Sequence, residues 1–375
     1  MKEWPEIYKT KISIFSIRRL IQLLSCIIVL FIGIQFYAFV AQLEAGIIPG
    51  FERPPGVEAF LPISALVSLK HFFVTGKINT IHPSALVIFS IICMTALIVK
   101  KGFCSWVCPI GLLSDILAKF NDLSFKQKVV LPIWADMVLR SIKYGLAGFF
   151  IWSIFYKMPI QSIEQFIQSP YNQFADIKML HFFTHISNTA LIVILVLILL
   201  SFVIPYFWCR YLCPYGAVLG VFSFLSIGKI KRNPYNCTNC GRCEKKCPSL
   251  IKIRKKESIL SSECTACMAC VKNCPEKQAL GFSLSPGNIQ LGQTAIALIL
   301  VFMFSMGISM AKVSDNWQNE ITKTAYLRYV IQSTLSWNLN GQLESKKREK
   351  MMRAMETIQA QSPQMMQSFK KREIK

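Results

Sequence analysis

The sequence predicts a mainly α-helical protein: a polytopic membrane helical bundle of about five spans, containing two repeated hairpins, with a small cysteine-rich α+β domain. Composition is the first observation behind this prediction. Of 375 residues, 53% are hydrophobic, yet Lys and Arg total 42 against 20 Asp and Glu. This combination does not fit one soluble globule and is typical of membrane spans with basic flanks. Long apolar stretches and a doubled cysteine motif are the other two observations.

The doubled motif has the spacing C-x2-C-x2-C-x3-C-P, running from Cys237 to Pro248 and again from Cys264 to Pro275. Bacterial ferredoxins that hold two [4Fe–4S] clusters use this spacing, and the fourth cysteine of each copy ligates the other cluster. The sequence therefore predicts a ferredoxin domain over 226–287 with two [4Fe–4S] clusters. The predicted iron ligands are Cys237, Cys240, Cys243 and Cys274 for cluster 1, and Cys264, Cys267, Cys270 and Cys247 for cluster 2.

Zinc and disulfides are the alternatives for these cysteines. Zinc also takes four cysteines, but a generic zinc site does not require this repeated spacing. A disulfide framework needs an oxidising compartment, and the charge distribution places the segment inside the cell. Cys26 and Cys93 lie alone in apolar runs and are predicted to be inert core residues.

Five apolar stretches are predicted membrane spans, at about 21–41, 84–99, 142–156, 189–207 and 289–310. The first is too long for a signal-peptide core, and no convincing cleavage site follows it. It is therefore predicted to be retained, with 1–20 as a basic cytoplasmic N-terminus. A four-span membrane domain over 21–225 would precede the ferredoxin domain. A fifth span over 288–311 and a basic, Met-rich tail over 312–375 would follow it.

Charge predicts which side each loop occupies. Residues 100–140 contain six basic and three acidic residues, and residues 209–287 contain thirteen and four. Basic loops remain on the cytoplasmic side, so both segments are predicted to be cytoplasmic. The fifth span would carry the tail to the other side. The chain is thus predicted to be a multi-pass protein of a bacterial or archaeal inner membrane.

A C-x3-C-P motif follows the second predicted span and recurs 105 residues later, after the fourth. An even number of spans separates the copies, so the two hairpins share one orientation. Together, four thiolates could ligate a third cluster or a metal; alternatively, each pair could cycle between dithiol and disulfide. Simple packing is the third interpretation, which the repeated pattern disfavours. The first two remain open for Cys104, Cys108, Cys209 and Cys213.

The outer loops also repeat: His71 matches His181, and Glu58 matches Glu164. Paired histidines can hold haem between helices or bind a quinone head group, with the two glutamates as proton acceptors. A histidine at the membrane interface is the simpler alternative, and it is favoured over haem. These four residues form the candidate quinone site of the sequence. No catalytic residue is assigned.

This ordered set of motifs, over about residues 15–285, resembles the membrane polyferredoxin family of the NapH, NosR and CcoG (FixG) kind. The resemblance implies an electron carrier of the inner membrane, and the NapH type is similar to a quinol-oxidising partner of a periplasmic reductase. The chain departs from NapH by its fifth span and long tail. It also has no room for the flavin-binding domain of NosR or the immunoglobulin-like domain of CcoG.

The favoured function is electron relay between the quinone pool and a partner redox protein, as a subunit or accessory of a respiratory reductase system in anaerobic respiration. The alternative is a regulatory or metal-maturation role, such as copper reduction, because thioethers bind Cu(I). The methionines that suggest it are Met351, Met352, Met355, Met365 and Met366. Predicted partners are membrane lipid, quinone and the redox protein. Nucleic acid is disfavoured, because the spans account for the basic charge.

Overall fold

The computed structural model describes residues 16–124, 131–276, 278–286 and 289–337, with side chains up to Ser333. The chain divides into two compact units. Unit 1 comprises Met1–Val29, Ser90–Ile151 and Thr189–Ser309; unit 2 comprises Leu30–Phe89, Trp152–Asn188 and Met310–Lys375. Each unit is described separately below. The methionines that suggested copper chemistry lie outside the described residues.

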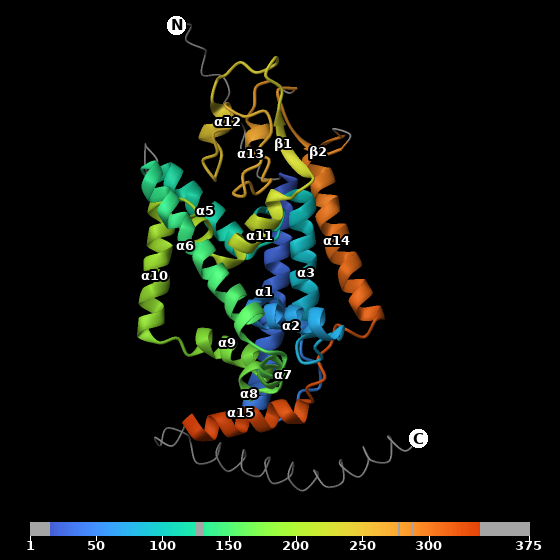
Figure 1. Cartoon of the computed structure of the whole chain (residues 1–375). Coiled ribbons are helices and arrows are strands. Elements are labelled where there is room, and N and C mark those ends of the chain that lie inside the picture. Colours follow the sequence, from blue (N-terminus) through green and yellow to red (C-terminus); the bar gives the residue numbers. More distant parts are fainter. Residues whose placement is uncertain (1–15, 125–130, 277, 287–288, 338–375) are drawn as a thin grey trace. The chain divides into compact units, whose positions relative to one another are not determined.

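Unit 1 contains the start of α1, the end of α3, most of α14 and all of the cysteine motifs (Figure 1). Its helices are α1 (Ile17–Glu44), α3 (Pro83–Val99), α4 (Gly102–Trp106), α5 (Pro109–Ser124), α6 (Ile133–Trp152), α10 (Asn188–Val203), the π-helical turn η3 (Trp208–Leu212), α11 (Pro214–Phe224), α12 (Arg242–Lys245), α13 (Ala269–Lys272) and α14 (Gln293–Val313). Its strands are β1 (Gly228–Arg232), β2 (Leu280–Leu284) and β3 (Ile289–Leu291).

The predicted apolar stretches fall mainly on helices, but the fifth begins later than predicted, because Ile289–Leu291 form strand β3 and helix α14 starts only at Gln293. Among the described residues, three helices are long and apolar enough to cross a bilayer, at Ile17–Glu44, Ile133–Lys157 and Gln293–Val313. A fourth crossing results if Ala175–Thr184 and Asn188–Val203 form one broken span. The helix Pro83–Val99 is apolar but shorter. The chain is therefore a mostly helical membrane protein with a small sheet domain.

The sheet of unit 1 has the antiparallel order β1-β2-β3, with Ile230 paired to Phe282. Both side chains are buried, because residues directly opposite each other on paired strands point to the same face of the sheet. They share a core with Val99 of α3, Trp106 of α4 and Leu300 of α14. This shared core attaches the sheet domain to the end of α3, to α4 and to α14.

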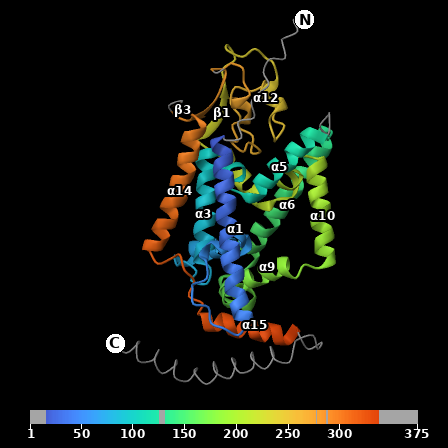
Figure 2. The same ribbon diagram turned by 180° about the vertical axis from the view of Figure 1, so that it is seen from behind.

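Unit 2 contains the end of α1 and the start of α3, together with short helices. These are the 3-10 turn η1 (Pro55–Phe60), α2 (Pro62–Thr75), the π-helical turn η2 (Ser153–Lys157), α7 (Ile160–Gln168), α8 (Pro170–Gln173), α9 (Ala175–Thr184) and α15 (Lys323–Trp337). Helix α15 lies against the end of α1 (Figure 2), where Tyr326 meets Phe39 edge to face with ring centroids 5.7 Å apart.

Candidate functional site

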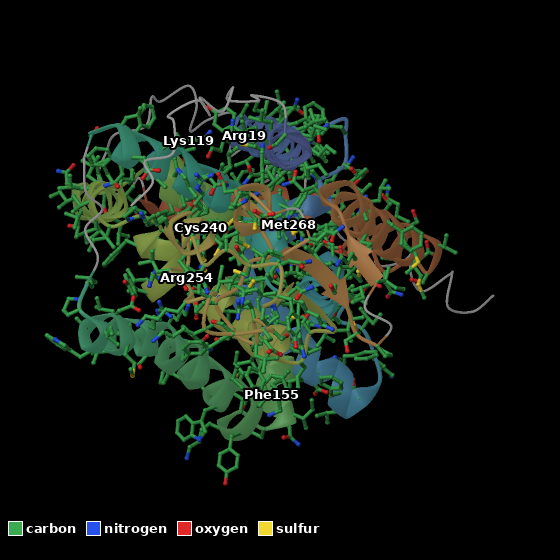
Figure 3. The ribbon with its side chains drawn as sticks, turned by 90° about the horizontal axis from the view of Figure 1, so that it is seen from above. Arg19, Lys119, Phe155, Cys240, Arg254 and Met268 are labelled. Atoms are coloured by element: carbon green, nitrogen blue, oxygen red, sulfur yellow. The ribbon has the colours of Figure 1, made fainter. Side chains whose placement is uncertain are left out.

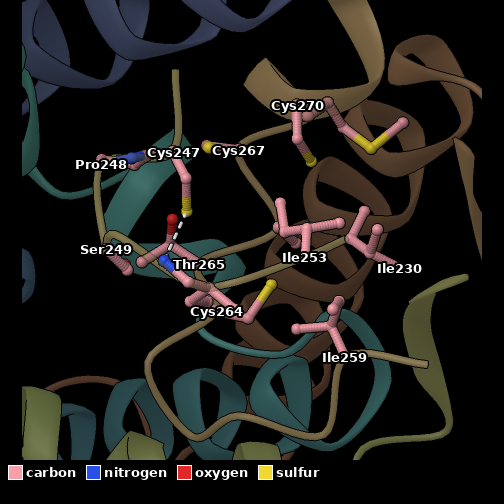
Figure 4. A pocket seen from close by; sticks show the side chains of 13 residues that line it. Ile230, Cys247, Pro248, Ser249, Ile253, Ile259, Cys264, Thr265, Cys267 and Cys270 are labelled. Carbon is pink, nitrogen blue, oxygen red and sulfur yellow. Dashed lines mark hydrogen bonds between the residues drawn. The ribbon is translucent and has the colours of Figure 1, made fainter. Parts of the chain in front are cut away.

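The eight ferredoxin cysteines gather into two sets of four, each around its own cavity. One cavity is lined by Cys237, Cys240, Cys243 and Cys274, and the other by Cys247, Cys264, Cys267 and Cys270. In the second cavity the four thiols face one another across an apolar floor (Figure 4). Each set takes three cysteines from one motif and the fourth from the other, which is the grouping that crossed ligation requires.

The backbone of the two motifs repeats the same local conformation. Asn239 and Gly241 have φ values of 54° and 73°, and their counterparts Ala266 and Met268 have 49° and 59°. Left-handed residues at these points turn the chain tightly between successive cysteines. Helices α12 and α13 then begin directly after them and carry the third cysteine of each motif. The spacing of the cysteines thus follows from one turn geometry used twice.

The two sets differ in exposure. Cys264, Cys267 and Cys270 are buried, whereas Cys240 is exposed. Burial raises the pKa of Cys247 to about 11, while the backbone N–H of Asn239 lowers the pKa of Cys237. Arg254 and Cys240 both line the exposed cavity, and both are labelled in Figure 3. The set at Cys240 therefore faces solvent, and the set at Cys264 faces the domain core.

The first C-x3-C-P loop is hydrogen-bonded directly to the buried cysteine loop. Ser105 Oγ donates to the carbonyl of Thr265 at 2.6 Å, and the Trp106 indole N–H donates to the carbonyl of Ala266 at 3.1 Å. Thr265 and Ala266 lie between two of the buried cysteines. These bonds hold the membrane-side motif and the ferredoxin loop in one arrangement.

Helix α1 secures the same loop from the other side. The side chains of Arg18 and Gln22 both donate to the carbonyl of Ser105, each at 2.9 Å. They also both contact Asp115 on α5. The Tyr206 hydroxyl donates to the same carboxylate at 2.6 Å. Asp115 follows the first C-x3-C-P motif, and Tyr206 precedes the second. Through Asp115, the polar residues of α1 are therefore connected to both copies of the repeat.

Glu263, directly before Cys264, connects the ferredoxin loop to two lysines. Its carboxylate lies 2.9 Å from Lys101 Nζ and 2.8 Å from Lys143 Nζ, and it accepts a hydrogen bond from Tyr144 at 2.9 Å. Burial opposes the charge, but the two ammonium groups outweigh it and lower the pKa of Glu263 to about 2. Glu263 is therefore a buried carboxylate whose negative charge is compensated by Lys101 and Lys143.

The four cysteines of the repeat also come together within unit 1. Burial and its neighbours Cys108, Cys209 and Cys213 raise the pKa of Cys104 well above its usual value. Burial also raises the pKa of Cys108 and Cys213, and that of Cys209 to about 12. Four mutually close thiols from two loops have the donor set of a further iron–sulfur cluster. Among the described residues, no group of three or more His, Cys, Asp or Glu is arranged to hold a single metal ion.

Gly111 explains part of the C-x3-C-P-x-G pattern. A Cβ at this position would lie 2.0 Å from the carbonyl oxygen of Cys104, so no other residue fits. The matching Gly216 is less constrained, because its Cβ would lie 3.6 Å from the carbonyl oxygen of Cys209. The two loops also differ in backbone conformation, since Cys104 is carried on an α-helix and Cys209 on a π-helical turn.

The candidate quinone residues all lie in unit 2, and each described one has a different set of neighbours. His71 interacts with the carbonyl of Lys77 at 3.1 Å, and His181 pairs with Glu44 at 3.0 Å. Glu164 is exposed. Glu58 is buried and contacts Arg53, at 2.8 Å.

His82 is a buried histidine that sequence reasoning did not single out. Its Nδ1 lies 3.2 Å from Glu58, and its Nε2 lies 2.6 Å from the carbonyl of Asn172. Burial opposes its charge, but the hydrogen bond to Glu58 and the negative charges of Glu58 and Asp176 together outweigh burial and raise the pKa of His82. Arg53 also binds Asp176, which completes a buried charge network. The position of His82 directly before the second predicted span was the only sequence signal for it.

Comparisons with known proteins agree with the two kinds of cysteine site. A family model described as a 4Fe–4S binding domain matches residues 81–129 and 189–233, which contain the two C-x3-C-P motifs. A second, described as a 4Fe–4S dicluster domain, matches residues 229–275. No solved structure matches the chain.

Among curated relatives, the Escherichia coli (strain K12) protein YccM, whose name assigns it to electron transport, is 39% identical over 325 residues. This match covers 85% of the chain and 90% of YccM. The uncharacterized protein MJ0750 of Methanocaldococcus jannaschii is 31% identical over 217 residues, covering 57% of the chain and 84% of MJ0750. The ferredoxin-type protein NapH of Haemophilus influenzae is 25% identical over 192 residues, covering 48% and 61%.

Apolar helices joined to two four-cysteine sites define a membrane iron–sulfur protein of the electron-transport class. The chain belongs to the NapH-like family of 4Fe–4S membrane polyferredoxins. Its match to YccM covers most of both chains. The resemblance read from the motifs is thereby confirmed.

Proposed function

We propose that the chain relays electrons between the quinone pool and a partner redox protein, using two [4Fe–4S] clusters in its ferredoxin domain and a third redox group at the membrane surface. The carrying observation is the pair of hydrogen bonds from Ser105 and Trp106 to the loop of Cys264 and Cys267. They place the C-x3-C-P motif against the buried cysteine set, as a relay requires.

In this proposal Cys237, Cys240, Cys243 and Cys274 hold the outer cluster, and Cys264, Cys267, Cys270 and Cys247 hold the inner one. Clusters of this kind supply one-electron transfer. The chain itself fixes their position through the Ser105 and Trp106 bonds. The ammonium groups of Lys101 and Lys143 balance the Glu263 charge beside the inner set.

For the repeat, we favour one four-thiolate ligand set over two separate dithiols. The reason is that Cys104 has cysteines of both loops as neighbours, not only its own partner Cys108. A single cluster would use all four thiols at once, whereas dithiol exchange needs each pair alone. Cys104 lies on α4, the helix that is hydrogen-bonded to the ferredoxin loop.

The exposed outer set is the proposed contact for the soluble partner. Cys240 reaches the surface, and Arg254, which is paired with Glu244, lines the same cavity. A cluster held here would be the more accessible of the two to a soluble partner. The ferredoxin domain and the basic loops are proposed to lie on the cytoplasmic side of an inner membrane, in line with the charge bias.

Metal content provides the first test. Anaerobically purified protein should contain at least about eight iron atoms and eight acid-labile sulfides per chain, and about twelve if the repeat holds a third cluster. Iron and sulfide assays on one sample give both numbers. Zinc in place of iron would contradict the proposal.

The relay itself is tested by stopped-flow reduction of the clusters in liposomes that contain quinol. Cys104→Ser and Cys209→Ser should leave both ferredoxin clusters assembled but slow their reduction at least about tenfold, because each removes a thiol from the shared set. Cys93→Ser, at a buried cysteine outside the motifs, is the matched control. Wild-type rates in both motif variants would leave the repeat with a structural role only.

A further inference from the structure

A cleft of about 290 Å³ lies in unit 1 beside the buried cysteine set. Its walls come from the start of α6, the residues that follow α10, and the chain that follows Cys247. This volume is close to the lower end of the range for small-molecule sites, roughly 300 Å³. The cleft is separate from the cavities of the eight ferredoxin cysteines, although Cys247 lines both it and the inner cavity.

The lining is apolar with a few fixed polar groups. Ile133, Ile204 and Pro205 supply apolar surface. Asp136 lies between two guanidinium groups, at 2.6 Å from Arg140 and 2.9 Å from Arg210. Because both arginines share this carboxylate, it acts as a brace that fixes their orientation rather than as a free base.

One donor in this wall lacks an acceptor. The Nε of Arg140 is buried and has no hydrogen-bond partner, while the Nη2 of the same residue binds Asp136. The side chain of Arg210 is only 8% exposed, so the wall itself is built and largely desolvated. Nε itself is enclosed by protein, but the Arg140 side chain is 25% exposed and lines the cleft. The cleft wall therefore presents a cationic side chain to an acceptor atom of a ligand.

We infer that this cleft binds the head group of a membrane quinone. A quinone ring is flat and apolar, which suits the isoleucine and proline walls. Its carbonyl oxygens are acceptors, which suits Arg140 and, at the exposed rim, Lys252. Helix α6 is itself one of the long apolar helices, so a lipid-soluble ligand reaches the cleft along it.

The cleft lies beside Cys247, a proposed ligand of the inner cluster, so a quinol bound there would be close to the electron relay. This inference rests on the proposed relay function and specifies where the quinone pool meets the chain. Oxidation of one quinol to quinone releases two electrons and two protons. The redox groups of the relay would take the electrons one at a time, and the protons would pass to water at the rim of the cleft. This location replaces the outer-loop residues as the candidate quinone site.

The test uses the full chain in phosphatidylcholine nanodiscs, with iron content as the check on folding. An azidonaphthoquinone should label peptides from 131–140 and 204–211 on illumination. Arg140→Met should weaken this labelling about tenfold or more, because one charge-assisted hydrogen bond is lost. Arg19→Met removes one positive charge outside the cleft and should label as wild type. Ile133→Trp, at an exposed position, fills the cleft and should also block labelling.

Stopped-flow reduction by quinol in the same nanodiscs distinguishes a wrong quinone site from a wrong relay function. Quinol-dependent reduction of wild type with labelling elsewhere, or labelling unaffected by Arg140→Met and Ile133→Trp, overturns the site and keeps the relay. Labelling in the cleft without any reduction of wild type keeps the site and overturns the relay. Loss of wild-type labelling when anionic phospholipid is added at constant quinone would identify a lipid head group as the occupant and overturn the inference.

Discussion

Single residues determine how closely the backbone after each C-x3-C-P motif approaches the first cysteine of that motif. The two glycines that follow the C-x3-C-P motifs make the clearest comparison, because they match in sequence but not in surroundings. Gly111 has the carbonyl of Cys104 in the space that a Cβ would occupy, and Gly216 has room. The sequence displays the pair as equivalent; only the packing distinguishes them.

Gly111→Ala is therefore expected to be damaging and Gly216→Ala tolerated. Relieving a 2.0 Å contact requires the backbone around Cys104 to move, at a cost of about 1–3 kcal/mol or more. Thermal unfolding followed by fluorescence, together with iron content, measures both effects. Equal melting temperatures for the two variants would show that the loop of Cys104 adjusts without strain.

His82 predicts a pH dependence in unit 2. Because its pKa is raised above the usual 6.5, its contribution to stability is fully present below that pH and is lost as the pH rises through the folded-state pKa. The melting temperature of wild type should therefore fall across this interval, and that of His82→Gln should change less. His71→Gln, at a partly exposed histidine of the same unit, is the control. Parallel curves for wild type and His82→Gln would mean that folding does not shift the pKa of His82.

At the scale of elements, a helix of five residues connects the membrane part of unit 1 to its iron–sulfur part. Helix α4 carries Cys104, and the two residues that follow Cys104 donate hydrogen bonds to the loop between Cys264 and Cys267. Neither motif predicts these hydrogen bonds on its own. The charge of the loop predicts that α4 lies near the membrane surface, but no feature of the sequence indicates that Trp106 contacts Ala266.

Trp106→Phe keeps the buried ring and removes only the indole N–H. The expected cost is about 1 kcal/mol of stability, with a shift in the EPR signal of the inner cluster but not of the outer one. Trp134→Phe, at a residue that is 72% exposed, is the control. Identical EPR spectra for wild type and Trp106→Phe would show that the inner cluster does not depend on α4.

The ferredoxin motifs illustrate how a covalent spacing can predict a three-dimensional grouping. Cys247 lies in the first motif but lines the cavity of the second. Cys247→Ser should therefore weaken or abolish the EPR signal of the cluster at Cys264, Cys267 and Cys270. The reciprocal control, Cys274→Ser, should affect the other cluster. Loss of the cluster of its own motif in Cys247→Ser would show uncrossed ligation.

For the molecule as a whole, the sequence predicted the class of protein and the cysteine groupings better than its buried polar sites. Apolar length and cysteine spacing are local properties, so they can be read without coordinates. The salt bridges of Glu263 with Lys101 and Lys143 join residues 162 and 120 positions apart, and no periodicity marks them. The same holds for Arg53 and Asp176, 123 positions apart.

The number of crossings remains a prediction for the whole chain. Reporter fusions after Asn121 and after Ser261 should both be active on the cytoplasmic side, and a fusion after Lys375 on the opposite side, because the basic loops stay inside and a fifth span separates them from the tail. A fusion after Asn188, in the balanced outer loop, is the control for the opposite side. Cytoplasmic activity after Lys375 would mean that Gln293–Val313 does not cross.

The unequal exposure of the two cysteine sets has a consequence for handling the protein in air. Oxygen meets the thiolates at Cys240 before it meets those at Cys264, Cys267 and Cys270, which are shielded by the domain core. Oxidative damage to cysteine follows exposure. Brief aeration should thus destroy the outer cluster before the inner one. The remaining protein would keep its inner cluster and its iron–sulfur absorbance but could no longer transfer electrons to a soluble partner.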